Sequence, residues 1–329
     1  MAAMSSARIK EIFARSWLVI SIGIVVLLAW RAPAGAAPII ELGLIDVGVV
    51  LVMFLGSVKL SPDQFKKAAK QPWALLLCMI SVFGAAPIIS LIIARLLGLH
   101  GEEDRLAVLI CSTQATTLAT GIVLTELAGG YVAMAMVITV ASNALSAVLT
   151  PLGFRVFGGG AEVNVHFFSM AGELALKILL PVLLAQFLRP LLGGWAERHS
   201  RRLSLICQFI ILIIIYTGVS AGLDTLSEHP YVLLKVALMA FVFHIVFIAF
   251  NAAVFSRVSE DSKHRTAFVL CSAQKTLPAG ILIWKSHFPG LPLGPMVAVC
   301  YHIVQLVVDS ALAPSFTKLP LIRNASRHV

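Results

Sequence analysis

Two short polar segments interrupt long apolar stretches of the chain, and their residue types suit the binding of a small solute or ion. The first runs from Cys111 to Ile122 and the second from Cys271 to Ile281. Aligned with one gap, they share Cys, Ser, Gln, Thr, Leu, Gly and Ile in the same order. Amide and hydroxyl groups both donate and accept hydrogen bonds, so they can line a polar cavity. The residues that we predict to bind a solute are Gln114, Thr116, Thr117, Thr120, Gln274, Lys275, Thr276 and Pro278.

Lys275 stands out among them, because a cation in the middle of an apolar stretch is costly unless it is paired or solvated. Three roles fit its chemistry. It can bind an anionic group of the solute, take the place of a coupling cation, or carry a proton. The alternative is a structural ion pair with Asp309 in the last apolar stretch. Two other polar residues in apolar surroundings, His244 and Asn251, are interpreted as hydrogen-bonded residues of the core.

The apolar stretches identify a protein of the membrane. Hydrophobic residues make up 59% of the chain, charged residues make up 12%, and the mean hydropathy is +0.95. A soluble domain is excluded, since it would carry about 25% charged residues. A hydropathy window of about 19 residues predicts an all-helical fold of about ten membrane spans. They lie near 16–32, 38–58, 73–98, 106–127, 131–157, 169–192, 203–223, 231–256, 265–285 and 292–315.

The two polar segments fall in the fourth and ninth predicted spans, which divides the chain into equivalent halves, 1–160 and 161–329. An odd number of spans in each half turns the second half upside down, and such inverted repeats are typical of secondary transporters. Gly and Pro in both segments indicate broken helices, which are tolerated at membrane depth only where they line a cavity. We therefore expect two broken helices that cross near the middle of the membrane. For any single hydroxyl, the alternative is a bond to its own helix.

The charged residues predict the orientation of the chain. Basic residues gather at the N-terminus and in alternate connections, so by the positive-inside rule both termini are cytoplasmic. They form no single basic face, and nucleic acid is not expected as a partner. The five cysteines lack the spacing of a metal or redox site and are predicted to be free thiols. The basic residues of these connections are Lys59, Lys66, Lys67, Lys70, Arg189, Arg198, Arg201, Arg202, Arg257, Lys263 and Arg265.

Further motifs occur in a specific order along nearly the whole chain. They are Phe54-Leu55-Gly56, Lys70-Gln71-Pro72-Trp73, the two polar segments, and Tyr301-His302-Ile303-Val304-Gln305-Leu306. In this order the chain resembles the bile acid:sodium symporter family, and more closely its SBF-like branch. The resemblance implies a core domain, formed by 73–157 and 231–315, that moves against a panel domain formed by 16–58 and 169–223.

The resemblance also implies a sodium site, with Thr139, Ser142, Asn143 and Gln274 at or beside the ligand positions. The family glutamate that precedes Gln274 by four residues is Leu270 here, and the family glutamine of the third span is Val82. The family asparagine that follows the retained glutamine is Lys275. We therefore predict that one ion site is lost and that Lys275 supplies its positive charge. Sodium and a proton both remain candidates for the coupling ion, and no other cofactor is expected.

Together these features predict a secondary active transporter that moves a small, anionic organic solute by alternating access in a bacterial inner or plasma membrane. One alternative is a carrier of the arsenite- or auxin-efflux type, favoured by the cysteine at each polar segment. Another is a non-transporting regulatory protein built on a transporter scaffold. An ion channel is not expected because the sequence offers no ring of repeated carbonyls or charges. An enzyme is not expected either, because no nucleophile and base occur together in a soluble loop.

Overall fold

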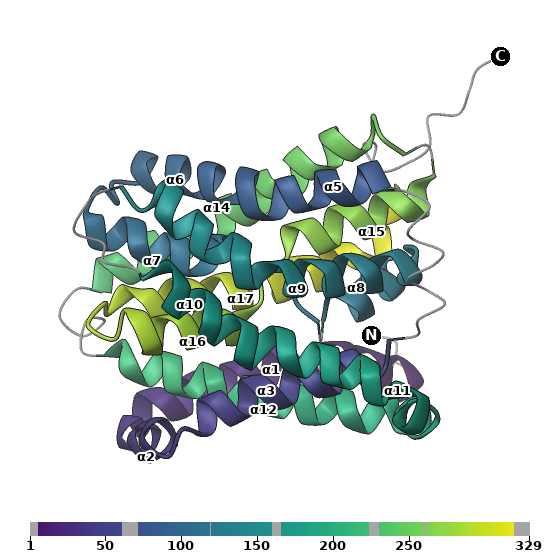
Figure 1. Cartoon of the computed structure of the whole chain (residues 1–329), viewed down its shortest axis with the longest axis horizontal. Helices are drawn as coiled ribbons and strands as arrows, with labels where there is room; N and C mark the ends of the chain where they lie inside the picture. Colours follow the sequence, from purple (N-terminus) through teal and green to yellow (C-terminus); the bar gives the residue numbers. More distant parts are fainter. Residues whose placement is uncertain are drawn as a thin grey trace.

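The computed structural model describes residues 6–60, 72–118, 120–159, 166–223, 230–259 and 261–318. Within these ranges the protein is all-helical, and its long helices run side by side (Figure 1). Seven of the described helices are long and apolar enough to cross a membrane, and a bent pair would make an eighth. The seven are Pro72–Leu96, Val132–Phe157, Phe167–Arg198, Ser200–Ala221, Tyr231–Phe255, Ser262–His287 and Leu293–Leu312.

Ten spans were expected, and interrupted helices explain the difference. The expected span 38–58 divides at Gly43, whose φ of 68° ends α2 (Ala36–Glu41) before α3 (Leu44–Val58) begins. With 15 residues, α3 is shorter than the roughly 20 residues that cross a hydrocarbon core. The expected span 106–127 is likewise split, into α7 (Glu102–Ser112) and α8 (Gly121–Leu127). The bent pair, Ile20–Arg31 and Pro33–Glu41, turns by 102°.

The remaining helices keep the expected order along the chain, and two of them widen into a π-helical turn. Widening occurs at Ser81–Ala85 and at Ala175–Leu179, and in each case a proline follows two residues later. The bounds of the remaining elements are α1 (Ser6–Arg31), η1 (Pro33–Gly35), α5 (Pro72–Ile80), η2 (Ser81–Ala85), α6 (Ala86–Leu96), α9 (Val132–Phe157), α10 (Phe167–Leu174), η3 (Ala175–Leu179), α11 (Leu180–Arg198), α12 (Ser200–Ala221), α14 (Pro230–Phe255), α15 (Ser262–Ala273), α16 (Leu277–His287), α17 (Leu293–Leu312) and η4 (Ala313–Lys318).

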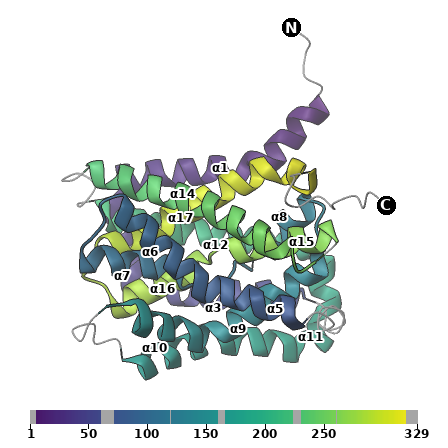
Figure 2. The same cartoon turned by 90° about the horizontal axis from the view of Figure 1, so that it is seen from above.

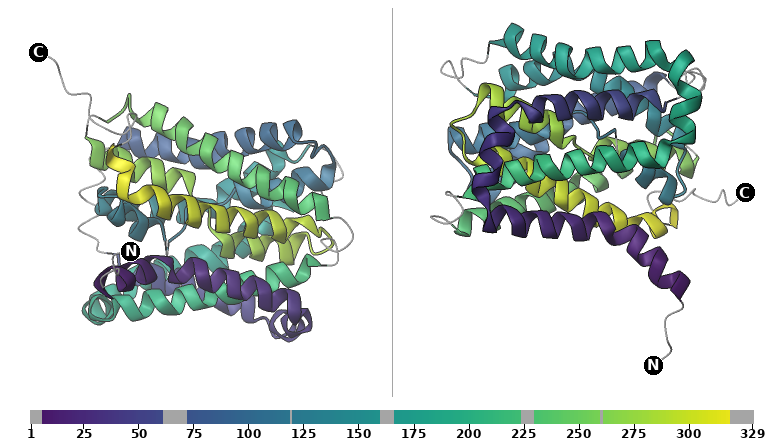
Figure 3. Two further views of the ribbon diagram at one scale, coloured as in Figure 1. Left: turned by 180° about the vertical axis from the view of Figure 1, so that it is seen from behind. Right: turned by 90° about the horizontal axis from the view of Figure 1, so that it is seen from below.

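The helices form two layers, which Figure 1 shows one above the other. One layer holds α1, α2, α3, α11 and α12, and within it α3 packs against both α11 and α12. In the other layer α17 packs against α7 and α14, and α15 packs against α9 and α14. Figure 3 shows the same division from behind. The long helix α10–η3–α11 joins the layers, because α10 packs against α9 while α11 packs against α3.

Charged residues lie near both ends of the long helices. Figures 1 and 2 show the starts of α5 and α15 and the end of α11 at one end of the molecule, and α2 and the α6–α7 turn at the other. The basic residues Arg198 and Lys263 lie at the first end, and Arg95 and Arg105 lie at the second. The predicted orientation also rests on acidic residues in the opposite connections and on basic residues near the C-terminus. The following charged residues of these sets lie outside the described residues: Lys66, Lys67, Lys70, Glu162, Asp224, Glu228, Arg323 and Arg327. All five cysteines are free thiols.

Candidate functional site

Two helices are interrupted at the polar segments, and the interruptions touch. The first break separates α7, which ends at Ser112, from α8, and the second separates α15 from α16 between Ala273 and Leu277. The backbone N–H of Thr276 in the second break donates to the carbonyl of Ala115 in the first, at 2.8 Å. Pro278 helps to end the helix, because it has no N–H to offer to the carbonyl of Gln274.

Helix α9 holds the first break in place with side chains. The Nδ2 atom of Asn143 donates to the carbonyl of Thr116 at 2.9 Å, and the hydroxyl of Thr150 donates to the carbonyl of Thr113 at 2.8 Å. Ser142 accepts the N–H of Thr116 at 3.4 Å. Backbone groups that the interrupted helix leaves free are thus bonded by side chains where lipid or water cannot bond them.

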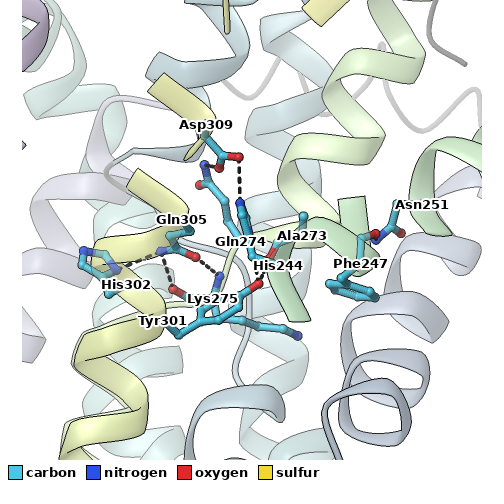
Figure 4. Close-up of polar contacts among 10 residues, drawn as sticks. All are labelled: His244, Phe247, Asn251, Ala273, Gln274, Lys275, Tyr301, His302, Gln305 and Asp309. Atoms are coloured by element: carbon cyan, nitrogen blue, oxygen red, sulfur yellow. Dashed lines mark hydrogen bonds and ion pairs between the residues drawn. The ribbon is translucent and has the colours of Figure 1, made fainter. Parts of the chain in front are cut away.

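Helix α17 holds the second break in a similar way (Figure 4). The side-chain oxygen of Gln305 accepts the backbone N–H of Lys275 at 2.8 Å, and Nε2 of Gln305 donates to the carbonyl of Lys275 at 3.0 Å. The hydroxyl of Tyr301 donates to the carbonyl of Ala273 at 2.6 Å. The same Nε2 of Gln305 also lies 2.8 Å from Nδ1 of His302. Both sides of the break are therefore fixed to one helix.

The ammonium group of Lys275 is buried among neutral groups. Its Nζ atom donates to the carbonyls of Val82 at 2.5 Å and Gln114 at 3.1 Å, and it lies 5.7 Å from the ring centroid of Phe247. The side chain is 2% exposed. The ion pair between Lys275 and Asp309, which was the structural alternative for this lysine, is not formed, because Asp309 bonds to other partners.

The carbonyl of Val82 is available to this lysine because of the π-helical turn. The N–H of Ala86 donates to Ser81, five residues back, instead of to Val82. In the same π-helical register the next donor would be residue 87, which is Pro87 and has no N–H. The carbonyl of Val82 therefore has no donor within its own helix, and it accepts a hydrogen bond from the ammonium group of Lys275 instead.

A second polar cluster lies beside the break. His244 on α14 places Nε2 at 2.9 Å from Oδ1 of Asp309 and Nδ1 at 3.0 Å from the hydroxyl of Tyr301. Gln274 donates from Nε2 to Oδ2 of Asp309 at 2.8 Å. Both members of the His244 and Asp309 pair are completely buried. The sequence signal for this cluster is the spacing of Tyr301, Gln305 and Asp309, because polar residues four apart share one face of a helix.

The predicted solute-binding residues are buried around the two breaks. Three of their oxygen atoms have no partner in the described part of the chain: Oε1 of Gln114, Oγ1 of Thr116 and Oε1 of Gln274. The last two lie beside the same glycine, since a Cβ atom on Gly121 would sit 3.9 Å and 3.0 Å from them. Thr120 donates its hydroxyl to that of Thr117 at 3.3 Å.

In this conformation the predicted solute-binding residues are closed off from solvent. The most exposed of those with a polar side chain, Thr120, is 5% exposed. Pro278 is buried too, in the first turn of α16. A groove of about 410 Å³ between α5 and α9 is lined by apolar residues such as Met79, Phe83 and Leu149, and contains none of the predicted residues. The structure thus shows a closed arrangement around the breaks.

The four candidate sodium ligands hydrogen-bond mainly to other groups of the protein. The hydroxyls of Thr139 and Ser142 donate to backbone carbonyls of α9, and Asn143 and Gln274 donate their amide N–H groups to other partners. Only two amide oxygens of the four, those of Asn143 and Gln274, have no partner, and neither is charged. Leu270, in place of a glutamate, supplies no oxygen. Hard cations need several oxygen ligands, and the sodium site at these four residues stays a prediction.

Comparison with known proteins gives the family. Residues 16–318 match the model of the SBF-like CPA transporter family. The chain belongs to this family. An uncharacterized protein of Pseudomonas aeruginosa is 28% identical over 301 residues, which cover 89% of this chain and 90% of the relative. "Probable sodium/metabolite cotransporter BASS4, chloroplastic" of Arabidopsis thaliana is 30% identical over 74% of this chain and 60% of the relative.

A further relative is named as a cotransporter of bile acid. "Sodium/bile acid cotransporter 7-B" of Xenopus laevis is 29% identical over 216 residues, which cover 63% of this chain and 62% of the relative. The family is one of transporters and two of these relatives are named as cotransporters, so the expectation of a transporter instead of an enzyme is confirmed. Apolar helices of membrane-spanning length agree with a multi-pass membrane protein.

Proposed function

We propose that this protein is a secondary active transporter that moves a small, anionic organic solute by alternating access. The observation that carries the proposal is the contact between two interrupted helices, made by Thr276 and Ala115, with the buried charge of Lys275 beside it. Interrupted helices at the centre of a membrane protein mark the binding site in many transporters. The names of the relatives support transport of a solute together with a cation.

The proposed architecture has ten spans in two inverted halves, 1–160 and 161–329. It counts the short helix α3 and the pair α7 and α8 as spans in addition to the eight that length and apolarity identify. The proposed panel corresponds to the layer that holds α1, α3, α11 and α12 in Figure 1, and the proposed core to the layer that holds both breaks. Transport would tilt one layer against the other and uncover the breaks from alternate sides.

The proposed solute contacts are the side chains at the breaks. The unpartnered oxygens of Gln114, Thr116 and Gln274 can accept hydrogen bonds from hydroxyl or N–H groups of a solute. The charge of Lys275 favours an anionic group nearby. We further infer that this ammonium group replaces a bound sodium ion, because it contacts two neutral carbonyls and makes no ion pair within the described residues. Uptake should then need no sodium.

Uptake into proteoliposomes tests the proposal. The solute is first found by a thermal-shift screen of anionic metabolites with and without sodium, because a ligand that binds the native state raises its stability. Gln274→Ala and Gln114→Ala should each weaken binding about tenfold or more, since a buried amide partner is lost. Gln208→Ala, on α12 away from the breaks, is the matched control. Normal uptake by both variants would place the cavity elsewhere.

The same vesicles distinguish the alternatives. A regulatory protein on a transporter scaffold would bind a ligand without any uptake. A carrier of the arsenite-efflux type would depend on the thiols of Cys111 and Cys271, so Cys111→Ser and Cys271→Ser would abolish transport of arsenite. We expect both variants to leave the uptake of the organic solute within a factor of about two, because serine is close to cysteine in size and a hydroxyl at position 271 can bond the same two groups as the thiol, Thr125 and the carbonyl of Ala135.

A further inference from the structure

The cluster of His244, Asp309 and Tyr301 has a hydrogen-bond pattern that requires one labile proton. The carbonyl of Ala273 can only accept, so the hydroxyl of Tyr301 must donate to it. The same hydroxyl oxygen then accepts from Nδ1 of His244, and this nitrogen therefore carries a hydrogen. The other ring nitrogen, Nε2, lies 2.9 Å from Oδ1 of Asp309.

A proton must lie between Nε2 and Oδ1. Without it, the lone pair of a neutral imidazole would face a carboxylate oxygen at hydrogen-bond distance in a fully buried site. The pair is therefore either an imidazolium with a carboxylate or a neutral imidazole with a carboxylic acid, and both have a net charge of zero. Oδ2 of Asp309 meanwhile accepts the amide of Gln274 in either form.

We propose that His244 and Asp309 bind the proton that couples transport, and that Tyr301 transmits its release to the second helix break. This inference rests on the proposed transport function and names its coupling ion. On release, the proton leaves the pair for water, and His244 keeps a single hydrogen, on Nε2, bonded to the ionised Asp309. Nδ1 then becomes an acceptor and takes the hydroxyl hydrogen of Tyr301.

Loss of the proton therefore removes the donor from the carbonyl of Ala273, which ends α15 at the break. Two oxygens, 2.6 Å apart and without a hydrogen between them, repel each other, so the backbone of the break must shift. Gln274, the next residue, bonds to the carboxylate of the same pair. The proton thus determines the geometry of a segment that we propose to contact the solute.

Few other titratable groups face the pair. Tyr301 lies on the helix of Asp309, and Cys271 on α15 interacts electrostatically with Asp309. Cys111 on α7 interacts electrostatically with Tyr301 and with Lys275 at the break. The only ionisable residue of α6, which packs against α14, is Arg95 in its exposed last turn. His302 is directed to Gln305 instead.

Nuclear magnetic resonance can read the relay in the purified full chain without any solute. Nitrogen-15 labelling of histidine reports which ring nitrogen of His244 is protonated, and His244→Gln identifies its signal. Carbonyl-13C alanine combined with amide-15N glutamine selects only two Ala–Gln pairs in the whole sequence, Ala185–Gln186 and Ala273–Gln274. The pair in the continuous helix α11 is thus an internal control.

With rising pH in sodium-free buffer, Nδ1 of His244 should lose its hydrogen while Nε2 keeps one, and the Ala273 carbonyl shift should change at the same midpoint. The Ala185 carbonyl should not change. In Tyr301→Phe the Ala273 signal should no longer follow His244, because the hydroxyl that links the two is removed. His302→Gln, the matched histidine control, should keep the coupled change.

Three results would overturn the inference. They are a His244 ring that keeps the same protonated nitrogens at every pH where the protein stays folded, an Ala273 signal that stays fixed while His244 titrates, and the same coupled change in Tyr301→Phe. None of these measurements depends on uptake. A working relay in a protein that moves no solute would therefore contradict the proposed function alone, and uptake without the relay would contradict this inference alone.

Discussion

At the scale of single residues, the partners of a buried charge decide its role. Lys275 was expected to be either functional or paired with Asp309, and its ammonium group instead lies on the carbonyls of Val82 and Gln114. Its position in the sequence predicted burial, because a cation far from both ends of an apolar stretch cannot reach water. The position of this lysine in the sequence could not predict the two carbonyls that it contacts, which lie 193 and 161 residues away along the chain.

Replacing this lysine should be costly. Lys275→Met leaves two buried carbonyls without a donor, at about 1 to 3 kcal/mol for each, and it removes the proposed substitute for sodium. We expect uptake to fall by at least tenfold while the protein still reaches the membrane, as measured by uptake and by immunoblot of membrane fractions. Lys263→Met, at an exposed position, is the control. Uptake at the wild-type rate in Lys275→Met, or a strict sodium requirement in the wild type, would make Lys275 a purely structural charge.

The second polar cluster shows where reasoning from sequence fell short. His244 was interpreted as a bonded core residue, and it is indeed bonded, but its partners give it a chemistry that this interpretation omitted. The polar face of α17 was visible in the spacing of its residues. Which helix would face it was not visible, since that depends on how α14 and α17 pack. Tertiary packing, and not local pattern, assembled the cluster.

At the scale of elements, both interrupted helices begin and end where local chemistry places the boundary. Gly and Pro in the polar segments predicted the interruptions, whereas the π-helical turn at Ser81–Ala85 had no signal other than the proline that follows it. The start of α15 is set by Asp261, which accepts the N–H of Lys263 at 3.0 Å. Partial burial would raise the pKa of this carboxyl, but the bonds from Lys263 and His264 hold it below its ordinary value.

The Asp261 cap should make stability depend on pH in one direction. A carboxyl whose pKa is lower in the folded state stabilises that state above the unfolded pKa of about 4, and the contribution disappears as the pH falls through the folded value. Asp261→Ala should cost about 1 kcal/mol at neutral pH, measured by thermal unfolding in detergent. The difference from wild type should shrink below about pH 4. Asp261→Asn should retain most of the stability at neutral pH, because its amide oxygen can still accept. Equal losses in both variants would show that charge, and not capping, matters.

At the scale of the whole molecule, charged residues join the two layers at one end. Asp46 on α3 contacts Lys285 on α16 at 3.1 Å and Lys177 on the connecting helix at 3.3 Å, and Glu173 binds Lys177 and His287. If one layer tilts against the other, these pairs must break on that side. The sequence showed the charges, but not that they face one another across the layers.

Breaking the Asp46 and Lys285 pair should open the molecule more often. A partly exposed ion pair is worth about 0.5 to 1 kcal/mol, which shifts a two-state population about two- to fivefold. Asp46→Asn and Lys285→Met should each raise maleimide labelling of Cys111 and Cys271 by this factor, as read by mass spectrometry. The double variant should add little to Asp46→Asn, which also removes the contact with Lys177. Arg198→Met, outside this cluster, is the control. Unchanged labelling in all variants would show that the Asp46 and Lys285 pair does not hold the molecule closed.

The proposed orientation places both termini on the cytoplasmic side, where the basic helix ends would lie. A green fluorescent protein fused after Val329 should be fluorescent, and alkaline phosphatase at the same position should be inactive in cells. The opposite pattern would reverse the orientation of the whole chain, and with it the side on which Asp46 and Lys285 hold the layers together.

The π-helical turn at Ser81–Ala85 has a consequence for evolution. Such a turn is an α-helix that has accepted one inserted residue, so deleting Gly84 should return the helix to regular bonding and rotate the preceding half by about 100° relative to the rest. Pro87 would then stand four residues after Val82, so the carbonyl of Val82 would still lack a donor within its helix, but it would turn with the preceding half of the helix away from the ammonium group. The extra residue of the π-helical turn and the lysine at position 275 should therefore have been gained and lost together during evolution. Among related sequences, those without a lysine at this position are free to have the shorter helix, and those with one are not.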